Sequence, residues 1–138
     1  MRYLILVKAT AESAAEPRPA AQAAFLIAMT HYRDQLNKAG VLLDGNSLRP
    51  GSHGCRIRYD GDQRSVINTP FAKTSELIAG YTLIQVKSRE EALEWARRHP
   101  NPSSPGQPAE IEIRQLDELE DFAPSRSVDC YDETGATK

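Results

Sequence analysis

The sequence predicts a single α+β domain, with one sheet and two helices on one face of it. Its length of 138 residues is enough for one hydrophobic core and too short for two. Several short segments are continuously apolar or alternate apolar with polar residues, as strands do, while two others repeat apolar residues every three or four positions, as helices do. Each helix follows a separate strand, which favours an antiparallel or mixed sheet with both helices on the same face.

The N-terminal part predicts a strand, a loop and a long helix. The run from Arg2 to Lys8 has a continuous apolar centre, which is typical of a buried strand. Residues 9–19 show no periodicity and predict a loop. From Ala20 a helical pattern runs to Gly40, where glycine can take the left-handed conformation of a helix end. The residues expected on the inward face of this helix are Ala21, Phe25, Ala28, Tyr32, Leu36 and Ala39.

The middle of the chain predicts strands and a hairpin. A second strand begins at Val41–Leu43. In Cys55–Tyr59 apolar residues alternate with arginines, which predicts a half-buried strand with the arginines in solvent. Asp60-Gly61 predicts a tight turn, because both central positions of a type I′ turn need positive φ. Gln63–Ile67 is then the partner strand.

The C-terminal part predicts the longest strand, a capped helix and a last strand. Ile78–Val86 is the strand, and Ser88 with Glu91 forms a capping box at the start of the helix. Ala92, Leu93 and Ala96 are expected on the inner face of this helix, with Trp95 beside them. Pro100 and Pro102 end it. Glu110–Leu116 alternates as a last strand.

Beyond Leu116 the pattern stops, and an acidic stretch, Asp117–Asp121, is followed by polar residues. We expect this stretch to be frayed, although Phe122 could anchor its first part. The domain is therefore expected to cover residues 1–122, with 123–138 as a flexible tail.

Charge and hydropathy disfavour several functions. Lys and Arg number 17 and Asp and Glu 19, so the formal net charge is −2. A protein whose main role is to bind nucleic acid needs a basic face, which this balance does not supply. The apolar run Tyr3–Val7 is too short to cross a bilayer and lacks the features of a signal peptide. We therefore expect a cytoplasmic protein that binds neither nucleic acid nor membrane.

The sequence also gives no sign of a metal or cofactor. His31, His53 and His99 lie far apart and lack ligand spacing with Cys, Asp or Glu. Cys55 and Cys130 form no metal motif or disulfide framework, so two free thiols are expected. The chain contains no Gly-rich phosphate loop and no nucleophile elbow. We expect neither a metal nor a cofactor.

The segment from Asn68 to Glu76, Asn-Thr-Pro-Phe-Ala-Lys-Thr-Ser-Glu, resembles the Asp-Gly-Pro-Phe-Ala-Glu-Thr-Lys-Glu signature of the DGPF-type, YCII-related proteins. Flanking segments such as Ala39–Leu43 and Gly80-Tyr81 are similar to family segments in the same order. The resemblance implies a ferredoxin-like subunit, whose sheet packs on that of a second copy as a dimeric α+β barrel. It also implies a setting beside extracytoplasmic-function sigma factors, where such proteins commonly occur.

A homodimer also follows from the residues, because the sheet face without helices needs cover. Pro70 and Phe71 suit the wall of a small pocket, although Phe71 could equally be core. With Asn68 and Tyr81, they are the ligand-binding residues that we expect.

The signature differs from the family pattern in ways that bear on catalysis. Asn68 stands where the signature has aspartate, and an amide cannot act as a general base. Related proteins are thought to use a His and Asp pair with the His early in the first helix, but Ala20–Ala28 contains no histidine. His31 and Tyr32 remain as weak catalytic candidates: His31 is expected in solvent and Tyr32 in the core.

The function expected is therefore a homodimer that binds a small anionic molecule, as a regulatory partner in a sigma-factor system. The alternative is a metal-independent enzyme that performs acid-base chemistry on a small metabolite. A third possibility is a protein-interaction module that uses the acidic C-terminal segment.

Overall fold

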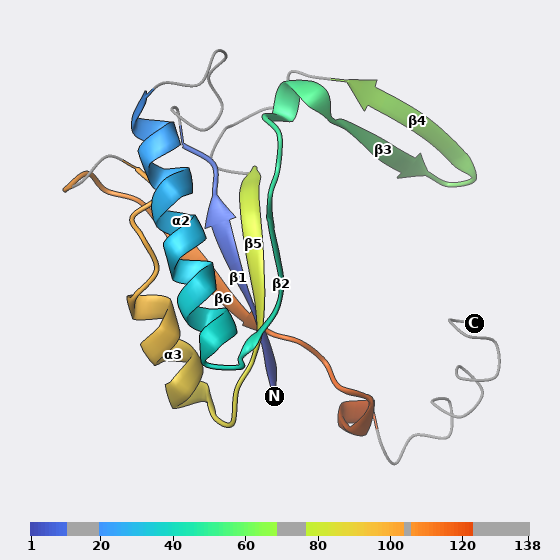
Figure 1. Cartoon of the computed structure of the whole chain (residues 1–138). Coiled ribbons are helices and arrows are strands. Elements are labelled where there is room, and N and C mark those ends of the chain that lie inside the picture. Colours follow the sequence, from blue (N-terminus) through green and yellow to red (C-terminus); the bar gives the residue numbers. More distant parts are fainter. Residues whose placement is uncertain (11–19, 69–76, 104–105, 123–138) are drawn as a thin grey trace.

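The computed structural model describes residues 1–10, 20–68, 77–103 and 106–122, and its centre is a four-stranded antiparallel sheet (Figure 1). The strand order is β2-β5-β1-β6, and β3 and β4 form a separate two-stranded sheet. The elements are β1 Arg2–Lys8, α2 Ala20–Lys38, β2 Leu42–Ser47, a 3-10 turn Gly51–His53, β3 Cys55–Asp60, β4 Gln63–Asn68, β5 Ile78–Gln85, α3 Arg89–Arg97, β6 Ile111–Gln115 and a 3-10 turn Leu119–Phe122.

Apart from the β3–β4 hairpin, the element order is that of a ferredoxin-like domain, in which two βαβ units are interleaved. The connection through α2 leads from β1 to β2 with β5 between them, and the connection through α3 leads from β5 to β6 with β1 between them. Both helices lie on one face of the sheet (Figure 1). The α+β fold class expected from the sequence is confirmed.

The core lies between the helices and the central strands. Alternate residues of β1, Tyr3, Ile5 and Val7, are buried on the helix side. The helix α2 meets them with a stripe of buried residues, which are Phe25, Met29, Tyr32 and Leu36. Met29 was not among the residues expected on this face, while Ala28 is only half-buried and Ala39 is exposed. The real stripe follows steps of four, three and four residues, which is one narrow face of a helix.

The ends of both helices form as their sequences predict. Gly40, just beyond α2, has a φ of 77°, the left-handed conformation that glycine adopts without a steric penalty. At the start of α3 the Ser88 hydroxyl accepts a hydrogen bond from the Glu91 amide at 3.1 Å. The Glu91 carboxylate in turn accepts from the Lys87 amide at 2.9 Å, one residue earlier than in a regular capping box.

The prediction that β3 is half-buried is wrong. All of its residues are exposed, and β4 is exposed except at Ile67. Alternation indicated two different sides of the strand correctly, but the hairpin leaves the main sheet and no helix packs on either side of it in the described structure (Figure 1). The hairpin turn forms one residue later than expected: Asp60 still pairs with Gln63, so Gly61 and Asp62 are the central residues, and Gly61 has a φ of 61°.

The expectation that the chain frays after Leu116 is also wrong for the first few residues. The Leu116 amide donates to the Arg2 carbonyl at 2.9 Å, and the Arg2 guanidinium donates to both Glu118 oxygens at 3.0 and 3.1 Å. The hydrogen bond from Arg2, followed by its charge, lowers the pKa of the Glu118 carboxyl. Residues 123–138, the predicted tail, lie outside the described residues.

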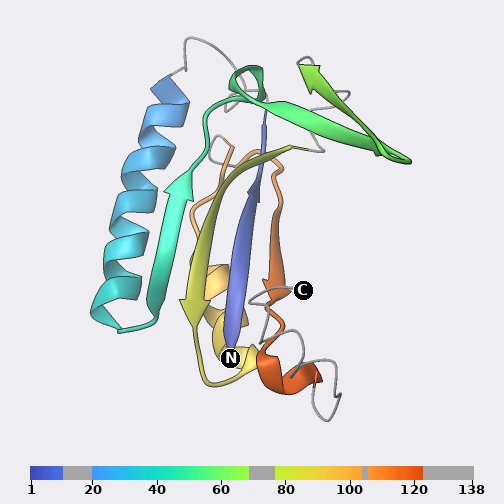
Figure 2. The same ribbon diagram turned by 90° about the vertical axis from the view of Figure 1, so that its right-hand side faces the viewer.

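The sheet face away from the helices carries half-buried apolar side chains. Neither α2 nor α3 lies over this face (Figure 2). The strand register pairs Leu4 with Leu83 and Leu6 with Tyr81 across β1 and β5. We call this surface the open face: Leu4, Leu6, Tyr81 and Leu83 at its centre, Asp44 and Asn46 on β2, and Glu112 and Arg114 on β6. No helix in the described part of the chain has the length and hydrophobicity needed to cross a bilayer.

Candidate functional site

A hollow of about 470 Å³ lies where β2 ends and β5 begins. Its volume is in the range that small-molecule sites occupy. Most of its wall is apolar or backbone, and Arg49 and His53 add polar groups. We call it the outer hollow. The residues that line it are Ala9, Ser47, Leu48, Arg49, Pro50, Gly51, His53, Gly54, Leu77, Ile78 and Ala79.

The outer hollow adjoins the signature segment in sequence. Leu77, which directly follows that segment, is part of the wall. Asn68 is exposed at the end of β4, where it pairs with Cys55. Pro70 and Phe71, the residues expected to form a pocket wall, lie outside the described residues. Their role as ligand-binding residues therefore stays a prediction.

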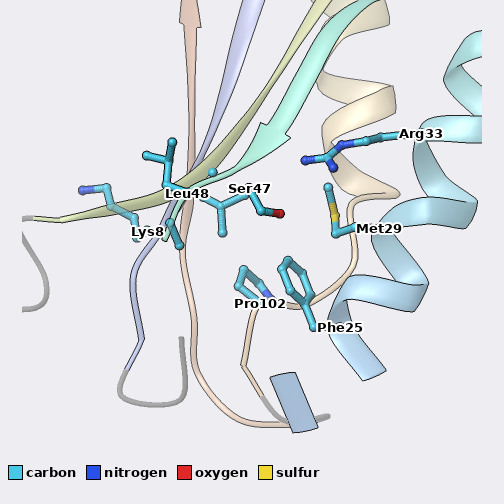
Figure 3. Close-up of a pocket in the computed structure, with 10 residues that line it drawn as sticks. Lys8, Phe25, Met29, Arg33, Ser47, Leu48 and Pro102 are labelled. Atoms are coloured by element: carbon cyan, nitrogen blue, oxygen red, sulfur yellow. The ribbon is translucent and has the colours of Figure 1, made fainter. Parts of the chain in front are cut away.

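A second, much smaller space of about 10 Å³ lies between α2 and the sheet, enough for about one water molecule (Figure 3). Arg33 and Met29 reach it from α2, with Phe25 and Pro102 facing each other at one side. We call it the inner pocket. Ser47, Leu48 and Ala79 line both the inner pocket and the outer hollow, so the two spaces share a wall.

Arg33 is the most unusual residue of the inner pocket. One of its Nη atoms donates to the Tyr81 carbonyl at a long 3.4 Å, while its buried Nε has no partner among the described residues. Burial lowers the pKa of the guanidinium, against the opposing effects of Tyr81 and Asp44. Glycine at position 45 makes the approach possible, since a Cβ there would lie 3.0 Å from the Arg33 Nε.

Positive charge therefore surrounds the shared wall of the two spaces. Lys8 and Arg33 line the inner pocket, and Arg49 lines the outer hollow. Lys8 is 3.6 Å from Glu112, so its charge is partly balanced. Arginine pairs well with carboxylate and phosphate oxygens, so this end of the sheet favours an anion over a cation.

Tyr81, the fourth predicted ligand-binding residue, belongs to a hydrogen-bonded group on the open face. Its hydroxyl donates to Asp44 Oδ2 at 2.8 Å and accepts from Asn46 Nδ2 at 3.0 Å. Asp44 and Asn46 were not recognised from the sequence. Their spacing of two residues on a strand places them on the same face, and this was the available signal.

The two weak catalytic candidates differ in their surroundings. His31 is exposed on α2, whereas Tyr32 is buried and its hydroxyl donates to the Trp95 carbonyl. Burial raises the pKa of Tyr32 to about 12. A phenol that is held this way stays protonated at neutral pH, so the local geometry favours packing for Tyr32. Across the described ranges, no three His, Cys, Asp or Glu side chains come together as a metal site.

His99 is a half-buried histidine next to this region, just beyond the end of α3. Its ring contacts Tyr32 edge to face, with the centroids 5.1 Å apart. Because a carbonyl can only accept, His99 Nδ1 donates to the Pro100 oxygen at 2.7 Å, which leaves Nε2 buried without a partner in the described structure. Burial lowers the pKa of His99, and the positive charge of Arg33 lowers it further.

Two comparisons with known proteins bear on this site. The YCII-related domain family matches residues 1–117. An uncharacterized protein of Rhizobium meliloti (strain 1021), R00369, is 33% identical over 81 residues, which cover 57% of this chain and 62% of that protein. The chain thus spans less than two thirds of that relative, whose name assigns no activity.

The lowered pKa of His99 predicts a stability that falls in mild acid. Below about pH 6.5, the imidazole of His99 binds a proton in the unfolded chain, whereas the native ring is still neutral. Protonation therefore lowers the free energy of the unfolded state relative to that of the native state. The free energy of unfolding keeps falling, by up to about 1.4 kcal/mol per pH unit, until the pH reaches the lower pKa of the native ring. Urea unfolding at about pH 7.5, 6.0 and 5.0 measures the free energy of unfolding across roughly this range.

The matched comparison is His99→Asn, which keeps a donor but does not titrate, against His31→Asn at an exposed position. We expect the first variant to lose much of the pH dependence between pH 7.5 and 5.0 and the second to retain it. Equal pH dependence in wild type and His99→Asn would show that His99 does not cause the effect.

Proposed function

Because this chain belongs to the YCII-related domain family, we propose that it works as a homodimer that binds a small anionic molecule. The observation that carries the proposal is the outer hollow of about 470 Å³ with Arg49 in its wall. Arg33 and Lys8 behind the shared wall add to its preference for an anion.

The open face supports the homodimer. Domains of this family are typically dimeric. Leu4, Leu6 and Leu83 form an apolar strip across two adjacent strands, and polar pairs flank it on both sides. An apolar centre with a polar rim is the usual anatomy of a protein interface. Two such faces packed about 10 Å apart would form the barrel.

The proposal includes a regulatory role beside an extracytoplasmic-function sigma factor. Its support is the resemblance of the signature segment to proteins that commonly occur beside such factors. In this role the bound anion would act as the signal, and the dimer would be the form that meets the regulatory partner.

A second candidate function is proton transfer on a small metabolite without a metal. The observation that favours it is the bond between Asp44 and the Tyr81 hydroxyl, which places a carboxylate and a phenol side by side on the open face. Carboxylates and phenols are both able to act as general acids or bases.

The dimer is tested by placing a charge at the centre of the open face. Leu4→Glu would put a carboxylate into an apolar interface, and we expect the dimer to weaken by about tenfold or more. Ile27→Glu, at a residue of α2 that is 62% exposed on the helix side of the sheet, is the control and should have no effect. Sedimentation velocity over a concentration series measures both, with circular dichroism to confirm folding. A wild-type chain that stays monomeric would remove this part of the proposal.

Anion binding is tested by thermal shift with a panel of small carboxylates and inorganic phosphate. A ligand at a hundred times its Kd should raise the melting temperature by about 5–10 °C. We expect Arg49→Gln to lose most of that shift, whereas Arg89→Gln, on the exposed surface of α3, should keep it. The same shift in wild type and Arg49→Gln would exclude the outer hollow as the site.

The enzymatic alternative makes a separate prediction. Asp44→Asn keeps the size of the side chain and removes its basicity, so turnover of any substrate found in a screen of small metabolites should fall by about a hundredfold or more. Binding and dimerisation should change little. Unchanged turnover in this variant would rule out Asp44 as the base.

A further inference from the structure

The hairpin formed by β3 and β4, residues Cys55–Asn68, is separate from the four-stranded sheet. We call it the arm. All its residues except Ile67 are exposed, and within the described part of the chain its strands pair only with each other. An isolated two-stranded hairpin is only marginally stable in water, so an arm of this kind gains stability when another surface covers it.

One side of the arm is apolar. The register pairs Ile57 with Val66 and Tyr59 with Arg64, which places these four side chains on the same side. Ile57, Tyr59 and Val66 are 47%, 65% and 63% exposed. The Arg64 guanidinium lies 4.9 Å from the centre of the Tyr59 ring and leaves most of that ring in solvent.

The arm extends on the same side of the sheet as the open face. In Figure 1 the helices lie on one side of the sheet and the arm projects on the other. Figure 2, which looks onto the open face, shows the arm across the end of the sheet. A strand of six residues is about 20 Å long, twice the usual spacing of about 10 Å between packed sheets. A body docked on the open face is therefore within reach of the arm.

The charges of the arm complement another part of the same chain. Residues 55–68 contain three arginines and two aspartates, for a net charge of +1. Residues 110–122 contain six acidic residues and one arginine, for a net charge of −5. The acidic segment begins at β6, on the edge of the sheet, and Arg2 fixes its position through Glu118.

We propose that the arm packs by its Ile57, Tyr59 and Val66 side on a second copy of this chain, next to the acidic segment 110–122 of that copy. The inference rests on the proposed homodimer and adds to it the second surface through which the two copies hold each other. A two-fold arrangement supplies two such contacts, because each arm reaches the other chain.

A second copy fits the arm better than an unrelated partner does. Docking of two open faces already brings the other chain to the side where the arm projects, so the arm needs no further partner. The same contact would cover an apolar hairpin that otherwise remains free to pair with other chains and aggregate.

The test compares two substitutions at adjacent residues of β4. Val66→Asp places a carboxylate on the apolar side of the arm, and Ser65→Asp places the same group on the opposite side, where Ser65 pairs with Arg58. Both positions are exposed, so neither change should unfold the subunit. We expect Val66→Asp to raise the Kd of the dimer by about tenfold and Ser65→Asp to change it less than about twofold.

A photo-cross-linking experiment locates the contact. The Tyr59 side chain is replaced by p-benzoylphenylalanine, and ¹⁵N-labelled and unlabelled chains are mixed before irradiation. We expect cross-linked peptides that join a labelled to an unlabelled chain, with attachment in residues 110–122 or on the open face. Cross-links confined to a single chain would overturn the inference, since the arm would then fold on its own subunit.

The outcomes separate the two proposals. A wild-type dimer whose Kd is the same in Val66→Asp as in Ser65→Asp overturns the role of the arm and leaves the homodimer in place. A wild-type chain that is monomeric at every concentration overturns the homodimer and the arm contact together.

Discussion

The alternation of side chains along β1 is the constraint on which the rest of the structure depends. Tyr3, Ile5 and Val7 point to the helices and are buried, whereas Leu4 and Leu6 point the other way. A strand at the centre of a sheet with helices on one face only has no alternative, because successive side chains must lie on opposite faces. Apolar residues on both faces of β1 are therefore stabilised by cover on both faces, and the described residues supply a layer on one of them.

Local sequence patterns predicted the helices, strands and turns. Contacts between residues distant in sequence determine which of these elements are buried and where the ordered structure ends. Gly40, the hairpin turn at Gly61 and the Ser88 cap act within a few residues, so their roles could be predicted to within one residue. The bond between Arg2 and Glu118 joins positions 116 residues apart, which is why the order after Leu116 was not foreseen. The alternation of residues in β3 predicted the two sides of the strand, but it did not predict which surface covers either side.

The candidate site was only partly predictable for the same reason. The signature segment directly precedes β5, and the outer hollow lies at the start of that strand. The roles of Arg33 and Asp44 were not predicted, because an arginine on a helix and an aspartate on a strand are usually surface residues. Only the pairing of β2 with β5 brings both of them next to Tyr81. Their positions around Gly45 depend on that pairing, and no spacing in the sequence encodes it.

The base of the arm connects assembly with binding. Residues 49–51 and 53–54 line the outer hollow, and β3 begins at the next residue, Cys55. A second copy that holds the arm would also fix the position of this wall, because the 3-10 turn Gly51–His53 joins the two. A ligand in the hollow would in turn favour the arm position that fits it. Since such coupling is reciprocal, the anion and the dimer would stabilise each other even if they share no direct contact.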